Sequence, residues 1–120
     1  MELPLPENGV CNLGTINLTK FIKYNTDSNK YIFDENEYIK TLKLLVRFLD
    51  NVLDLSDYPY EEVKNRAQQD RRLGICGLGG LGSALAMMKM AYDSPEAKVF
   101  IENLTILIKN IAYKESALLA

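Results

Sequence analysis

The sequence predicts a mainly α-helical fold in which four helices accompany one or two short strands, an α+β arrangement. Apolar residues from Tyr38 to Leu53 recur every three or four positions, as on one face of a helix. Residues 97–112 are apolar well beyond one stripe, which indicates a helix with neighbours on two sides. The chain has 120 residues, 48% of them apolar, which suits one globular domain and is too short for two.

The first segment with a pattern, residues 10–18 (VCNLGTINL), is short and contains Gly14. Glycine inside an extended segment marks a close approach of another group to the backbone, so we predict a strand or extended turn here. Residues 25–30 (NTDSNK) are of the types that hydrogen-bond their own backbone, and they predict a loop.

The helices follow in order. Asp34 and Glu37 form a capping-box pattern, which predicts a helix from there to about residue 55, ended by Pro59. Residues 60–70 predict a short polar helix and residues 83–90 a buried one. Ser94, Pro95 and Glu96 then predict the start of the last helix. This helix continues to the end of the sequence without a glycine cap, so we expect the chain to be part of something larger.

Composition excludes several classes of function. Fourteen basic and sixteen acidic residues leave a net charge of −2, which gives no electrostatic case for nucleic-acid binding. Histidine is absent, so catalytic sites that need an imidazole are excluded. No apolar run approaches the roughly 18 residues that span a membrane.

Two cysteines, Cys11 and Cys76, occur in a sequence with no signal-peptide pattern at its start. We expect a reducing cytoplasm and two free thiols, although a Cys11–Cys76 disulfide stays possible. Two thiols without histidine cannot complete a four-ligand zinc site.

Residues 74–82 (GICGLGGLG) hold five of the seven glycines and match the dinucleotide-binding pattern GxGxxG. The context is unfavourable, because residues 71–76 are a poor buried strand and no acidic residue ends a second strand about 20 positions later. Tight backbone packing is the preferred interpretation.

By local pattern alone, Glu2 is a carboxylate near a terminus and Cys11 a small core residue. The same holds for Cys76, to which no role is assigned. Asp54, Asp57 and the pair at 71–72 are interpreted as structural charges at helix ends.

A set of motifs in a fixed order nevertheless resembles the barrel domain of the large, catalytic subunit of ribonucleotide reductases. These motifs are MELPLP at 1–6, VCNLGTINL at 10–18, LDNVLD at 49–54, RRLGI at 71–75, GLGSAL at 80–85 and YDSPEA at 92–97. The resemblance covers nearly all 120 residues, which form a single partial domain, and is strongest for the adenosylcobalamin-dependent class.

The resemblance implies a fold, a reaction and roles for three residues. The fold is part of a ten-stranded α/β barrel, and the reaction is radical-based reduction of ribonucleotides for DNA synthesis. Glu2 matches the glutamate that takes the proton of the ribose 3′-hydroxyl. Cys11 matches one of two cysteines that reduce the 2′ carbon and become a disulfide. Leu13 matches a residue that lies against the ribose.

Several family residues are not in this sequence. They include the thiyl-radical cysteine two positions before the glutamate, the asparagine upstream of it, and the partner of Cys11. We therefore expect the chain alone to be inactive, to associate with itself, and to work only with the remaining segments of the subunit. The alternatives are a non-catalytic helical interaction module derived from such an enzyme and, less favoured, a dinucleotide-binding protein.

Overall fold

The computed structural model describes residues 4–120. Its elements are β1 (Asn12–Asn17), the 3-10 helix η1 (Leu18–Phe21), β2 (Ile22–Asn25), β3 (Lys30–Phe33), α1 (Glu35–Leu55), α2 (Glu61–Asp70), β4 (Leu73–Gly79), α3 (Leu81–Met87) and α4 (Pro95–Leu119). The predicted fold class is confirmed, since four α-helices dominate the described part of the chain. It also contains four short strands, more than the one or two expected.

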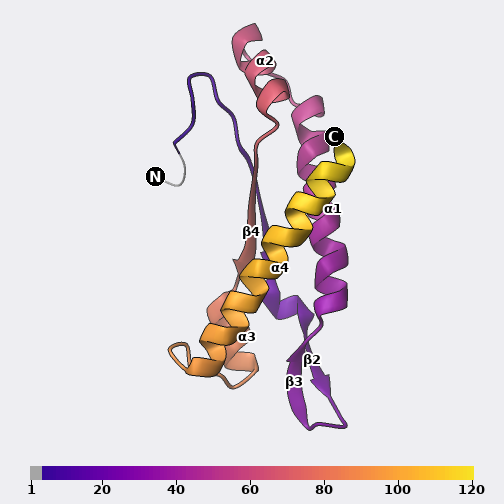
Figure 1. The fold of residues 1–120 in the computed structure, drawn as a ribbon, viewed down its shortest axis with the longest axis vertical. Helices are drawn as coiled ribbons and strands as arrows, with labels where there is room; N and C mark the ends of the chain where they lie inside the picture. Colours follow the sequence, from indigo (N-terminus) through magenta and orange to yellow (C-terminus); the bar gives the residue numbers. More distant parts are fainter. Residues whose placement is uncertain (1–3) are drawn as a thin grey trace.

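Strands β1 and β4 form a parallel pair in which Asn12 lies opposite Leu73 and Thr15 opposite Cys76. The interpretation of residues 71–76 as a poor strand was therefore wrong. The two long helices, α1 and α4, run along one side of this pair (Figure 1). The result is a two-layer arrangement with a small parallel sheet on a pair of helices.

Helix α1 forms because its local signals agree. The carboxylate of Asp34 accepts the backbone N–H of Glu37, which caps the first turn as predicted. The buried side chains recur at helical spacing and form one face; they are Tyr38, Leu42, Val46, Leu49 and Leu53. The predicted apolar face is confirmed.

Strands β2 and β3 form an antiparallel hairpin around the predicted loop. Phe33 at its end packs against Tyr38 of α1 and Phe100 of α4, with ring centroids 5.2 Å and 5.6 Å apart. These ring contacts join the hairpin to both long helices.

Ser94 caps α4 by accepting the N–H of Ala97, and Pro95 is its first residue, as predicted. Helix α3 ends at Met87, three residues before the predicted end, and Lys89 then adopts a positive φ of 59°. No helix in residues 4–120 is long and apolar enough to cross a membrane.

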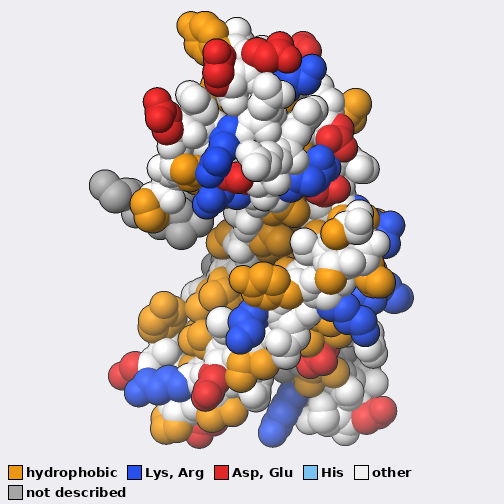
Figure 2. Space-filling view, turned by 45° about the horizontal axis from the view of Figure 1, so that its top comes forward, with side chains coloured by type: hydrophobic (Ala, Val, Ile, Leu, Met, Phe, Trp, Pro, Cys, Tyr) orange, Lys and Arg blue, Asp and Glu red, His pale blue; other side chains and the backbone are white. Residues whose placement is uncertain are grey.

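Apolar side chains gather across the middle of the face shown in Figure 2. Several large ones are exposed on the two long helices: Leu44, Phe48 and Leu55 on α1, and Val99, Ile106, Tyr113 and Leu118 on α4. An exposed apolar surface of this extent is typical of an interaction surface.

Candidate functional site

The side chains of β1 alternate between two environments. Asn12 donates a 3.2 Å hydrogen bond to the carbonyl of Leu49, so it faces α1. A Cβ built at Gly14 would lie 2.7 Å from Cδ1 of Leu45, also on α1. Because successive side chains of a strand point to opposite faces, Leu13 and its neighbours two positions away face the other side.

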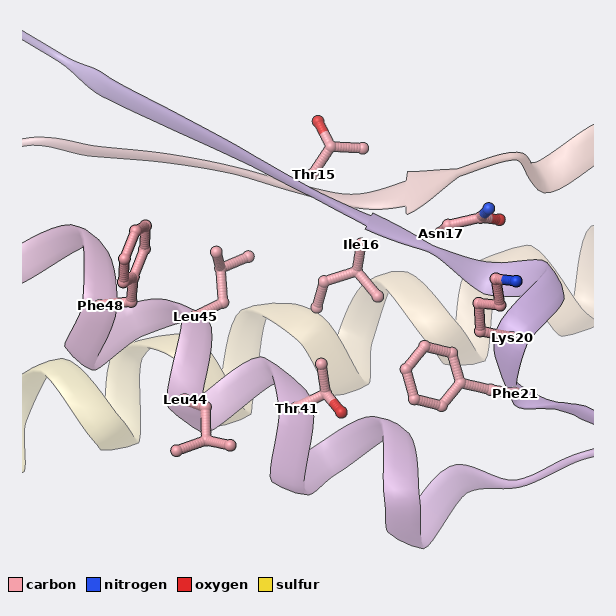
Figure 3. A pocket seen from close by; sticks show the side chains of 9 residues that line it. All are labelled: Thr15, Ile16, Asn17, Lys20, Phe21, Thr41, Leu44, Leu45 and Phe48. Atoms are coloured by element: carbon pink, nitrogen blue, oxygen red, sulfur yellow. The ribbon is translucent and has the colours of Figure 1, made fainter.

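Figure 3 shows the same alternation further along the strand, with Ile16 pointing toward α1 and Thr15 away from it. Residues paired across neighbouring strands point to one side, so β4 adds Gly74 and Cys76 to the side of Leu13 and Thr15. We call this side, which bears Cys11, Leu13, Thr15, Gly74 and Cys76, the open face of the β1–β4 sheet.

Cys11 and Leu13 are neighbours on the open face, and Gly74 lies between them. A Cβ built at Gly74 would be 3.2 Å from Sγ of Cys11 and would overlap Cδ2 of Leu13. The Leu13 side chain is 64% exposed and Cys11 is half-buried. The structure thus brings together two of the three predicted site residues, a thiol and an apolar side chain. The predicted glutamate, Glu2, lies outside the described residues.

Both cysteines are free thiols, as expected. Cys76 on β4 lies opposite Thr15 on β1, and Thr15 is four positions after Cys11. Cys11 and Cys76 are therefore separated by roughly 13 Å along the strand direction. That distance is far beyond the reach of a disulfide.

Four of the five glycines of residues 74–82 are packed against protein atoms, Gly82 being the exception. A Cβ at Gly77 would lie 2.5 Å from Oη of Tyr38, and one at Gly79 would lie 2.6 Å from the carbonyl oxygen of Ile16. Gly80 has a φ of +70° at the N-cap of α3, a conformation that favours glycine. These contacts support tight packing rather than a dinucleotide phosphate at this position.

Arg71 has a structural role, as the sequence suggests. It ends α2 in the left-handed conformation and donates to the carboxylates of Asp50 and Asp54 on α1. Hydrogen bonds to Asp54 and Asp50 raise the pKa of Arg71, and the same contact lowers the pKa of Asp54. The junction before β4 is therefore fixed to the end of α1.

A hollow of about 400 Å³ lies between η1, the end of β1 and the exposed side of α1 (Figure 3). Its lining is mostly apolar and includes Phe21, Leu44, Leu45 and Phe48, but neither Cys11 nor Leu13. In residues 4–120 no group of three or more Cys, Asp and Glu side chains could hold a metal ion.

Comparison with known proteins gives a family for this arrangement. The family model described as "Ribonucleotide reductase, barrel domain" matches residues 1–120. The chain belongs to this family. The resemblance read from the motifs is confirmed, and with it the interpretation as a fragment of the ribonucleotide reductase barrel.

Three relatives illustrate the similarity. The alpha subunit of a ribonucleoside-diphosphate reductase from Chlamydia trachomatis is 37% identical over 114 residues, which cover 95% of this chain and 10% of the relative. Proteins named vitamin B12-dependent ribonucleoside-diphosphate reductase are 34% identical in Thermoplasma acidophilum and 35% in Mycobacterium tuberculosis, each over 119 residues. These cover 99% of this chain and 15% and 16% of the relatives. The chain thus spans about a sixth or less of these reductases.

Gly74 is a neighbour of the candidate site residues that the sequence did not reveal. Its motif, RRLGI, contributed to the resemblance, but its contact with Cys11 and Leu13 depends on the register between β1 and β4. No local signal near residue 74 specifies that register.

Proposed function

We propose that this chain supplies part of the active site of a ribonucleotide reductase catalytic subunit. Cys11 is one of two thiols that reduce the 2′ carbon of a ribonucleotide, Glu2 is the acid/base group, and Leu13 lies against the ribose. The observation that supports this proposal is the placement of Cys11 and Leu13 side by side on the open face, with α1 packed on the other face.

The chemistry suits these groups. After a thiyl radical elsewhere in the enzyme removes the 3′-hydrogen, a carboxylate accepts the proton of the 3′-hydroxyl as the 2′-hydroxyl leaves as water. Replacing that hydroxyl by hydrogen consumes two electrons. Two thiols supply them and become a disulfide, which leaves a deoxyribonucleotide and water as products. Cys11 provides one of these thiols, and its partner belongs to another segment.

The complete enzyme uses adenosylcobalamin in this proposal, as the names of several relatives indicate for those proteins. The binding of this cofactor is assigned to other segments of the subunit in this proposal. The chain acts in the cytoplasm with the remaining segments of the subunit. By itself it is inactive and associates through its exposed apolar surface.

The test mixes the chain with polypeptides that carry the flanking regions of the subunit, together with adenosylcobalamin, a thiol reductant and ribonucleoside diphosphates or triphosphates. Formation of deoxyribonucleotides is measured. We expect activity only in the mixture, and Cys11→Ser to abolish it. Glu2→Gln should lower it about 100-fold. The matched control is Cys76→Ser, which changes the other free thiol and should leave turnover intact.

Turnover that survives Cys11→Ser would contradict the assigned role of this thiol. A stable complex that forms from all segments yet makes no deoxyribonucleotide would favour the non-catalytic interaction module. The observation that favours this interaction module is the set of exposed apolar side chains on α1 and α4.

A further inference from the structure

We propose that Gly74 is a positioning residue of the reduction site. Its lack of a side chain lets Leu13 lie across β4 beside the Cys11 thiol. The inference rests on the proposed function, and it adds a residue of a different strand that acts through Leu13 and Cys11.

The backbone at residue 74 does not require glycine. Among the glycines of residues 4–120, only Gly80 has a positive φ. Gly74 lies in regular pairing with Leu13, where any L-residue is accepted. Glycine inside a strand is also less stable than alanine, since it loses more conformational freedom on folding. The reason for glycine here is therefore the space beside it.

That space is occupied by the site residues. A Cβ at position 74 would overlap Cδ2 of Leu13, and it would lie 3.2 Å from Sγ of Cys11 and 3.3 Å from the carbonyl oxygen of Asn12. The Leu13 side chain is exposed and can rotate, so an alanine displaces it without disturbing the core. Gly74→Ala is therefore expected to move the Leu13 side chain while leaving the fold intact.

Two effects on the proposed reaction follow. Leu13 leaves its position against the ribose, which weakens substrate binding. The added methyl group also crowds one side of the Cys11 sulfur and slows the approach of a reacting carbon. Gly74 acts on both through packing, as a positioning residue.

The first experiment measures the thiol directly in the 120-residue chain. Each variant is treated with iodoacetamide, and alkylation of the peptide that contains Cys11 is followed by mass spectrometry. We expect Gly74→Ala to slow this reaction about fivefold, because access governs thiol reactivity. Adding Leu13→Val, which lacks the overlapping δ-carbon, should leave the alkylation slow, because the methyl group at position 74 still lies beside Sγ of Cys11.

Gly82→Ala is the matched control, since a Cβ at Gly82 would meet no atom within 4 Å. Its alkylation rate should equal that of wild type. Circular dichroism checks that all variants keep their secondary structure. A Gly74→Ala alkylation rate within about twofold of wild type would overturn the inference.

The second experiment uses the assembled reductase. Gly74→Ala should raise KM for the ribonucleotide about tenfold with a smaller change in kcat, and Leu13→Val should reverse part of this increase. An unchanged KM in an active enzyme would also overturn the inference. If the assembled enzyme fails with wild-type chain, the proposed function fails, while the alkylation rates still decide the role of Gly74.

Discussion

The hydroxyl of Tyr38 donates a 2.8 Å hydrogen bond to the backbone carbonyl of Gly77, which fastens the middle of β4 to the first turns of α1. Both groups are buried, and the Tyr38 ring packs between Phe21 and Phe33. Desolvation by burial raises the pKa of Tyr38 above its ordinary value of 10.0, and the nearby Cys76 adds to this effect. The bond therefore depends on a phenol that keeps its proton.

Tyr38→Phe should lower the free energy of unfolding by about 1–2 kcal/mol near neutral pH, because it leaves the Gly77 carbonyl without its partner. Because the pKa of Tyr38 is raised in the folded state, the contribution of its protonated phenol to the free energy of unfolding is fully present below pH 10.0 and is lost as the pH rises above that value. The difference in the free energy of unfolding between wild type and Tyr38→Phe, measured with urea, should become smaller above that pH. A constant difference into the alkaline range would contradict this.

Gly77→Ala should lower the free energy of unfolding by about 1–3 kcal/mol. The reason is that the new Cβ would lie 2.5 Å from Oη of Tyr38 and 2.6 Å from Cδ1 of Ile108 in the core. Urea unfolding measures the loss. Gly82→Ala serves as the control, because its Cβ meets open space and alanine favours a helix by about 0.5–1 kcal/mol over glycine. Equal stability of the two variants would show that the glycine run is not tightly packed.

The ion pair between Arg47 on α1 and Glu115 on α4 should stabilise the contact of the two long helices. The Glu115 side chain is only 4% exposed, whereas that of Arg47 is 53% exposed. Arg47→Met leaves a buried carboxylate without its partner and should cost about 1–2 kcal/mol, reduced from the fully buried case by the exposure of Arg47. The double variant Arg47→Met/Glu115→Leu should recover that loss in urea unfolding, and no recovery would exclude the pairing as the cause.

Asp54 should make the free energy of unfolding depend on pH in the acidic range. The hydrogen bond from Arg71 lowers its pKa below the ordinary value of 3.8. Its contribution is therefore present above pH 3.8 and is lost as the pH falls through the folded-state pKa. Asp54→Asn should be less stable than wild type near neutral pH and equal to it in strong acid. Unfolding curves at both pH values test this, and a difference that persists in strong acid would contradict it.

The helices were predictable because their signals are local. The cap at Asp34, the cap at Ser94 and the spacing of apolar residues in α1 all lie within a few turns of the structure that they specify. Strand β4 was not predictable, because three of its seven residues are glycine and strand propensity is correspondingly low. Pairing with β1 makes it a strand, and that contact is distant in sequence.

The candidate site likewise combines residues that local motifs identify with one that only a contact distant in sequence identifies. The motifs of residues 10–18 singled out Cys11 and Leu13, and the structure brings these two together. Gly74 joins them only through the register in which Leu13 lies opposite it, which depends on packing of the whole chain. Glu2 lies outside the described residues, so its distance from Cys11 stays a prediction.

The parallel pairing of β1 and β4 also bears on biosynthesis. During translation, the strand next to Cys11 leaves the ribosome long before Leu73, the residue that pairs with Asn12. Until then the edge of β1 that pairs with β4 has no partner within residues 4–120, and an unpaired edge readily joins other chains. A nascent chain stalled ahead of β4 would therefore expose the segment that carries Cys11, and chaperones that shield such edges are expected to act in this interval.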